Sequence, residues 1–204
     1  MKSFPALYLV AGLTLSLSQP IHSQGNPEAN KLAREGSQAY KDQDWDRAIS
    51  LLKRAFDLDH KYAPNLVAAY EQRAFAEAND QRFRDAILDL EAALKISPRE
   101  ARIYEQRAAV EVKINDYDKA VADYSEAIKL NPNEVRNYLY RGYIYELKGD
   151  VNNSMADTDK VLKIQPNNQQ ALARKQRLQK KQQSQAPPPG PVQNPSAPVP
   201  PKKP

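Results

Sequence analysis

The stretch Tyr70-Glu-Gln-Arg-Ala74 recurs without change as Tyr104-Glu-Gln-Arg-Ala108 in this chain. A related stretch, Tyr138-Leu-Tyr-Arg-Gly142, lies as far beyond Tyr104 as Tyr104 lies beyond Tyr70. A period of roughly 20 to 50 residues is the sequence signature of a repeat architecture, in which each repeat is one supersecondary unit. Internal repetition therefore decides the fold class of this chain.

Small residues and prolines recur in the same phase as these stretches. Small side chains allow two helix axes to approach closely. A proline ends a helix because it lacks an N–H group and clashes with the preceding turn. We therefore expect helix crossings at seven small residues and helix ends before three prolines: Gly36, Ala48, Ala74, Ala86, Ala108, Ala120 and Gly142, and Pro98, Pro132 and Pro166.

The repeated positions together resemble the tetratricopeptide repeat, a helix–turn–helix unit of about 34 residues. Apolar residues three and four apart between 120 and 128 agree with this, since they share one helix face. The resemblance implies an all-α fold, a right-handed α-solenoid of four hairpins. Residues 169–184 should form a C-terminal capping helix, because a stacked array must cover its last apolar surface. The predicted domain spans 24–184, with units at about 29–62, 67–100, 101–134 and 135–168.

Several positions depart from the family pattern or refine it. The interval between the first and second units is longer than the later ones, and Pro64 suits a first helical turn, so the second unit should begin one turn early. Val151 and Ser154 replace an aromatic residue and an alanine, which predicts a looser fourth hairpin. We expect the N-termini of helices to be capped by polar side chains at four positions: Asn26, Asp46, Asp118 and Asn152.

One basic and one acidic position recur together. Arginine occurs at one repeat position and aspartate sixteen residues later in units two to four, whereas the first unit has Glu35 and Leu51 instead. In an antiparallel hairpin these positions face each other, which predicts a partly buried ion pair in each of three units; separate solvated charges are the alternative. The predicted pairs are Arg73 with Asp89, Arg107 with Asp123, and Arg141 with Asp157.

The N-terminal residues 1–23 are predicted to be a secretory signal. Lys2 precedes an apolar run at 6–17 that is too short to span a hydrocarbon core of about 30 Å. Cleavage is expected after Ser18 or Ser23; the alternative is a buried N-terminal helix. The chain has no cysteine, which excludes a lipid anchor through that residue. Export without disulfides favours a bacterial periplasm or a secreted protein.

The C-terminal residues 185–204 are predicted to be a basic, proline-rich tail without regular structure. Seven basic and no acidic residues follow Asn168, so the net charge of +5 leaves −2 over residues 1–168. The body is therefore not basic, and no nucleic-acid partner is expected. The tail is either a spacer or a ligand for a polyproline-binding module, an anionic polymer or a membrane surface.

The sequence predicts no enzyme, no cofactor and no metal. Its two histidines are His22, inside the predicted signal, and His60, so without cysteine neither a zinc site nor a nucleophile–base pair can be assembled from the usual residues. No phosphate-binding glycine loop is present. The stretch 42–46 lacks the glycine and the bidentate acid of a calcium loop.

The resemblance implies that the first helix of each unit lines a concave groove for a peptide or helix of another protein. Phe75 and Tyr143 are the expected aromatic anchors, unless they pack against the neighbouring first helix. Ala33 and Ser37 replace the lysine and asparagine with which some family members clamp a C-terminal carboxylate. The matching groove positions are Tyr40, Lys41, Glu71, Phe75, Asn79, Arg102, Glu105, Lys113, Arg136, Tyr143 and Glu146.

These features predict an exported, non-enzymatic protein–protein interaction scaffold. The main alternative is a periplasmic chaperone or secretion-assembly factor that holds client proteins. A subunit of an enzyme whose catalytic residues lie on another chain, and a factor that holds anionic wall polymer or lipid through its tail, are further hypotheses.

Overall fold

A computed structural model of the chain describes residues 26–185. The predicted signal, and the predicted tail beyond Gln185, lie outside the described residues. Between 26 and 185 all of the regular secondary structure is helical, and there is no strand. Its elements are α1 (Pro27–Lys41), α2 (Trp45–Leu58), the short 3₁₀ helix η1 (His60–Tyr62), α3 (Ala63–Asn79), α4 (Phe83–Ile96), α5 (Ala101–Lys113), α6 (Tyr117–Leu130), α7 (Val135–Leu147), α8 (Val151–Ile164) and α9 (Gln169–Gln185).

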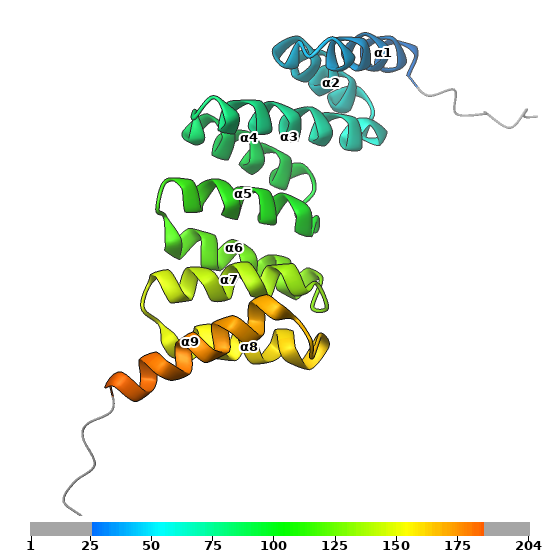
Figure 1. Cartoon of the computed structure of the whole chain (residues 1–204). Coiled ribbons are helices and arrows are strands. Elements are labelled where there is room, and N and C mark those ends of the chain that lie inside the picture. Colours follow the sequence, from blue (N-terminus) through cyan, green and yellow to red (C-terminus); the bar gives the residue numbers. More distant parts are fainter. Residues whose placement is uncertain (1–25, 186–204) are drawn as a thin grey trace, which may run out of the picture.

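The helices pack as four successive antiparallel hairpins that stack in chain order, as Figure 1 shows from blue to yellow. Within each unit the first helix packs on the second, and each second helix also packs on the first helix of the next unit. The last helix, α9, covers α8. This is the predicted all-α solenoid of four hairpins with a C-terminal cap. No helix within 26–185 is long and apolar enough to cross a bilayer.

Small side chains occupy the helix crossings. Ala48, Ala86, Ala108 and Ala120 are fully buried. At Gly36 a Cβ atom would lie 2.8 Å from Leu52 Cγ, so even an alanine would not fit without displacing that side chain. The helices can therefore come together because these side chains leave room for the facing helix.

The ends of the second helices agree with the predicted role of proline. Helices α4, α6 and α8 each end two residues before Pro98, Pro132 and Pro166. The residue before a proline is pushed away from helical backbone angles, which places the helix end one residue earlier still. The early start of the second unit is also confirmed: α3 begins at Ala63 and has 17 residues, against 13 in α5 and α7.

The predicted caps of the second helices were wrong by two residues. The capping side chains are Asp44, Asp116 and Asp150, which accept hydrogen bonds from the backbone N–H groups of Arg47, Lys119 and Asn153 at 3.1–3.4 Å. Each follows a residue of positive φ, namely Gln43, Asn115 and Gly149. This left-handed residue ends the first helix and lets the next one begin sooner than the sequence suggested.

The residues expected to cap have other roles or positions. Asp46 lies inside α2 and binds Arg73 of the next unit at 2.6 Å. Asp118 lies inside α6 and binds Lys148 of the next unit. The cap predicted at Asn26 is present, because its side chain accepts from the N–H groups of Glu28 and Ala29.

The fourth hairpin is not loosened at Ser154. This residue is fully buried, and its hydroxyl donates a 2.8 Å hydrogen bond to the backbone carbonyl of Gly142 across the hairpin. The Ser154 hydroxyl therefore has a hydrogen-bond partner, and this bond links α8 to α7, which an alanine at this position could not do.

The three predicted arginine–aspartate pairs are all present. Each arginine donates two hydrogen bonds to the carboxylate on the facing helix, at 2.6 Å for Arg73, 2.7 and 2.8 Å for Arg107, and 3.0 and 2.7 Å for Arg141. The aspartate side chains are only 6–7% exposed and those of the arginines 18–27%. The pairs are thus bidentate and largely buried, and the alternative of separate solvated charges is wrong.

Two of these pairs each have a further buried carboxylate nearby, that of Glu77 or Glu111. Glu111 is 3% exposed, and no residue within 26–185 forms a hydrogen bond with its Oε2 atom. Burial, aided by the negative charge of Asp123, raises the pKa of Glu111 to about 8, while Arg107 opposes both. Glu77 occupies the same position in the second unit, and burial raises its pKa too. Near neutral pH, Glu111 is therefore largely protonated.

We expect Arg107→Ala to lower the free energy of unfolding by about 3 kcal/mol, because it leaves the buried Asp123 carboxylate without a partner. Urea unfolding measures this. Lys53→Ala removes one partner of an exposed pair with Asp57, and should cost less than about 1 kcal/mol. Equal losses for the two variants would contradict a structural role of the buried pair.

The raised pKa of Glu111 also predicts a pH dependence. Between the ordinary value of 4.5 and about 8, the folded chain holds a proton that the unfolded chain has lost. The stabilisation is complete below pH 4.5 and is lost as the pH rises through 8, with a slope of at most about 1.4 kcal/mol per pH unit. Glu111→Gln cannot ionise, so its advantage over the wild type should grow from pH 5 to pH 8.

Urea unfolding at several pH values tests this expectation. Glu35→Gln, which changes an exposed glutamate, serves as the control and should follow the wild type. If the Glu111→Gln and wild-type stabilities run parallel across this pH range, Glu111 ionises normally in the folded chain.

Candidate peptide-binding groove

Hollows lie between successive first helices of the solenoid, on the face where α3, α5, α7 and α9 are foremost in Figure 1. Their volumes are about 240 Å³ between α3 and α5, 660 Å³ between α5 and α7, and 570 Å³ between α7 and α9. The first two share Gln106, Ala109 and Lys113, and the last two share Arg136, Tyr140 and Tyr143. These three hollows therefore adjoin one another in a row, and we call them together the groove.

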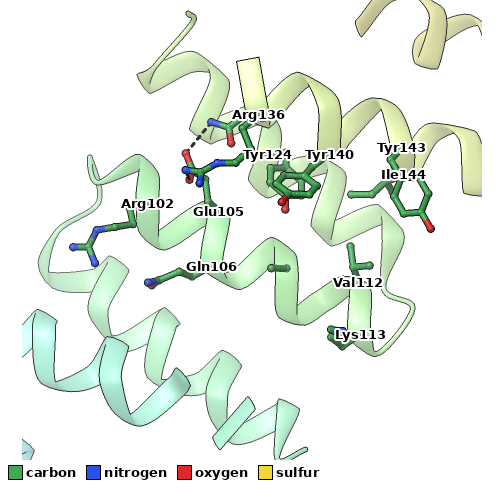
Figure 2. A pocket seen from close by; sticks show the side chains of 12 residues that line it. Arg102, Glu105, Gln106, Val112, Lys113, Tyr124, Arg136, Tyr140, Tyr143 and Ile144 are labelled. Carbon is green, nitrogen blue, oxygen red and sulfur yellow. Dashed lines mark hydrogen bonds and ion pairs between the residues drawn. The ribbon is translucent and has the colours of Figure 1, made fainter. Parts of the chain in front are cut away.

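Most residues predicted for the groove do line it. Glu71, Phe75 and Asn79 line the α3–α5 hollow. The α5–α7 hollow, shown in Figure 2, is lined by five others: Arg102, Glu105, Lys113, Arg136 and Tyr143.

The predicted groove residues at the two ends of the solenoid lie elsewhere. Lys41 lines a separate hollow of about 610 Å³ between α1 and α3. Tyr40 packs edge-on against Trp45, with ring centroids 5.3 Å apart, and belongs to the core of the first unit. Glu146 lines none of these hollows but binds two arginines beside the last one.

The groove carries three exposed aromatic side chains. Phe75, Tyr140 and Tyr143 are 64%, 49% and 47% exposed. Phe75 and Tyr143 occupy one repeat position, where the third unit has the small Ala109, so the groove is open between them. At these exposures the rings are not packed away against a neighbouring helix, and they can contact another molecule.

Tyr140 was missed by the sequence analysis. Its repeat position carries Gln72 and Gln106 in the preceding units, so the repeat pattern did not mark it as aromatic. In the structure its ring stacks on that of Tyr124 from α6, with centroids 5.6 Å apart, as the two overlapping rings in Figure 2 show. Tyr124 is 4% exposed, so the ring of the more exposed Tyr140 rests on a buried ring. Tyr140 could have been identified from the sequence by its helical spacing from Tyr143, which places both side chains on one face of the same helix.

Charged groups join neighbouring first helices along the groove. Arg102 Nη1 lies 2.6 Å from Glu71 Oε1, and Arg136 Nη2 lies 3.2 Å from Glu105 Oε2. The two pairs occupy equivalent positions, since both glutamates and both arginines are one repeat apart. Burial raises the pKa of Glu71, and Arg102 opposes this shift. These pairs therefore bridge α3 to α5 and α5 to α7 while leaving the arginine side chains about 60% exposed.

The last hollow is lined by arginines from two helices. Arg136 of α7 lies there with Arg174 and Arg177 of α9. Glu146 accepts hydrogen bonds from Arg177 at 3.2 and 3.3 Å, and its Oε2 lies 3.5 Å from Arg174 Nε. Arg174 is 7% exposed, and burial lowers its pKa.

The acidic side chains of the described residues are taken up in structural contacts or lie apart from one another. No group of three histidine, cysteine, aspartate or glutamate side chains within 26–185 is placed to hold a metal ion. The aspartates of the stretch 42–46 have structural partners: Asp42 accepts from Gln38, Asp44 caps α2, and Asp46 binds Arg73. The groove thus presents aromatic surface and charge for binding.

Two family comparisons match the C-terminal part of the solenoid. Residues 109–149 match the family described as TPR repeat, and residues 135–168 match the Tetratricopeptide repeat, the same residues as the fourth predicted unit. The sequence has no significant match among curated proteins.

Solved structures share the fold at low sequence identity. A tetratricopeptide repeat protein from Parabacteroides merdae superposes with a TM-score of 0.61 at 19% identity, covering 78% of this chain and 62% of that one. The first TPR of Spaghetti (RPAP3), bound to an HSP90 peptide, gives a TM-score of 0.53 at 17% identity, covering 57% and 93%. The Yersinia enterocolitica type III secretion chaperone SycD, in complex with a peptide of the translocator YopD, gives 0.51 at 15%, covering 55% and 92%.

The repeated sequence, the stacked hairpins and these matches agree. Residues 109–168 carry tetratricopeptide repeats, and the described residues share the α-solenoid fold of tetratricopeptide-repeat proteins.

Proposed function

We propose that this chain is a non-enzymatic interaction scaffold that binds a peptide or helix of a partner protein in its groove. The observation that carries the proposal is the row of adjoining hollows with exposed aromatic rings at Phe75, Tyr140 and Tyr143. An aromatic side chain supplies much contact area for little loss of conformational freedom, and aromatic residues dominate the binding energy of many interfaces.

The build of the groove supports this proposal. Its wall is made of helices held by buried ion pairs, so the anchors are positioned before a partner arrives, and binding then costs little ordering of the protein. The hollow at Ala109 lies between two aromatic positions and can receive a side chain of the partner. The RPAP3 and SycD structures, which have similar folds and hold peptides, support this proposal.

The test is a pair of variants in the groove. We expect Phe75→Ala with Tyr143→Ala to weaken capture of the native partner at least tenfold, since a truncated anchor typically costs about 2 kcal/mol. The matched control is Leu88→Ala: Leu88 is 62% exposed, close to the value for Phe75, but lies on α4 and lines none of the hollows described above. Binding is measured with residues 24–204 as bait, and again with residues 24–185 to remove the tail.

The outcomes separate the alternatives. One or two defined partners lost only in the groove variants support a scaffold. Suppressed aggregation of several unrelated denatured proteins, with no defined partner, would indicate the client-holding chaperone instead. If the groove variants still bind a partner, and if that binding is salt-sensitive and is lost when residues 186–204 are removed, the tail is the binding site. Retention by every variant would contradict both proposals.

We further propose that residues 1–23 direct export of the chain, on the basis of Lys2 and the apolar run that follows it. In a bacterial host the full-length chain should appear outside the cytoplasm with an N-terminus at residue 19 or 24. A version starting at residue 24 should stay in the cytoplasm. Uncleaved full-length protein in the cytoplasm would contradict this proposal.

A further inference from the structure

The hollow between α7 and α9 holds more positive than negative charge. Arg136, Arg174 and Arg177 line it, whereas no acidic side chain does. Arg136 is paired with Glu105 on the far side, at 3.2 Å. The other two arginines share the single carboxylate of Glu146. One positive charge in this hollow therefore has no counterpart of its own.

The unmatched charge falls on a buried group. Arg174 is 7% exposed, and no acceptor within 26–185 forms a hydrogen bond with its Nη1 atom. Its contact with Glu146 is long, at 3.5 Å. A buried guanidinium with an unused donor is unfavourable unless another group completes its interactions. Because this Nη1 atom is itself covered, an incoming carboxylate would contact the exposed Arg177 and would supply the missing negative charge next to Arg174.

The fold brings Arg174 close to α7. It lies against Gly142, where a Cβ atom would be 2.9 Å from Arg174 Nη1 and 3.2 Å from Asp157 Cβ. The equivalent positions in units two and three are Ala74 and Ala108. Glycine at position 142 thus makes room for the arginine, and α9 contributes a charged group to the hollow as well as covering the solenoid.

The rim of the hollow gives a second chemical preference. Tyr140 and Tyr143 line it beside the arginines and are about half exposed. A ligand that places a carboxylate among the guanidinium groups would also place its apolar neighbours on these rings. Arginine–carboxylate pairs are bidentate and directional, which favours a fixed pose over a diffuse charge contact.

We propose that the hollow between α7 and α9 is a subsite for a side-chain carboxylate of an acidic peptide segment in the partner protein. The inference rests on the proposed function, since the segment would continue along the groove. It places acid recognition at the opposite end of the array from Ala33 and Ser37, where the family's carboxylate clamp is absent. The partner segment is therefore acidic, with an apolar residue next to the carboxylate.

The test uses a fluorescein-labelled peptide of repeated Glu-Glu-Leu triplets and a matched peptide of Gln-Gln-Leu triplets. Arg177→Gln should weaken the glutamate peptide about tenfold and leave the glutamine peptide unchanged. Lys180→Gln is the control, because it removes the same charge from an exposed residue of α9 that does not line the hollow. Anisotropy titrations give the affinities, and the arginine Nε–Hε NMR signals of Arg174 and Arg177 should move with the glutamate peptide.

Glu146 gives a test of opposite sign. Glu146→Gln removes the carboxylate that occupies both arginines, so binding of the glutamate peptide should become about threefold tighter. A thermal melt of each variant checks that the solenoid remains folded. A purely structural role for Glu146 would instead leave binding unchanged or weaker.

The outcomes distinguish this proposal from the preceding one. If the glutamine peptide binds as well as the glutamate peptide and the two arginine signals do not move, the carboxylate subsite is overturned. The groove proposal is then still decided by the Phe75 and Tyr143 variants with the native partner. Equal movement of the arginine signals by inorganic phosphate would indicate a simple anion site and would also overturn the assignment to an acidic segment.

Discussion

The structure depends on the close approach of helices at positions that carry almost no side chain. Each hairpin buries a stripe of alanines and glycines, and each second helix then receives the first helix of the next unit. One hairpin alone could not bury both faces, so the stability of any unit is shared with its neighbours. A larger side chain at one crossing would therefore disturb two units, because interiors are packed without spare volume.

Charge is added to this apolar frame in two distinct ways. The arginine–aspartate pairs lie inside single hairpins, are largely buried, and fix how the two helices of a unit face each other. The glutamate–arginine pairs lie between units, leave their arginines exposed, and fix how successive first helices are spaced. The first set serves the fold. The second set makes a groove of fixed width whose wall still carries charge that a partner can contact.

The groove follows from what the stacking leaves open. First helices of adjacent units are joined through the second helix between them, so hollows remain between them on the other side. Their character changes along the array. The α3–α5 hollow is largely apolar around Phe75, whereas the α7–α9 hollow combines tyrosines with arginines. Such a gradient can orient a bound segment, because its two ends meet different chemistry.

Some features could be read from local sequence because they depend on neighbours along one helix or one hairpin. The extra turn of α3 followed from Pro64 and the longer interval between the first two units, and the buried Arg107–Asp123 pair followed from two positions that vary together. The caps were misplaced because a single left-handed residue before each cap, Gln43, Asn115 or Gly149, ends the first helix, and the next helix then begins two residues earlier than the repeat pattern indicated. Local chemistry alone did not give that geometry.

The sequence by itself determined the class of fold and the contacts inside each unit, because a fixed phase of small residues, prolines and paired charges permits only one way of folding a hairpin. Only the tertiary structure decided which side chains meet between units. It packed Tyr40 edge-on against Trp45, stacked Tyr140 on Tyr124, and brought Arg174 of α9 over Gly142. These contacts depend on the angle at which one hairpin lies on the next. That angle is set by packing over many residues, and no single repeat encodes it.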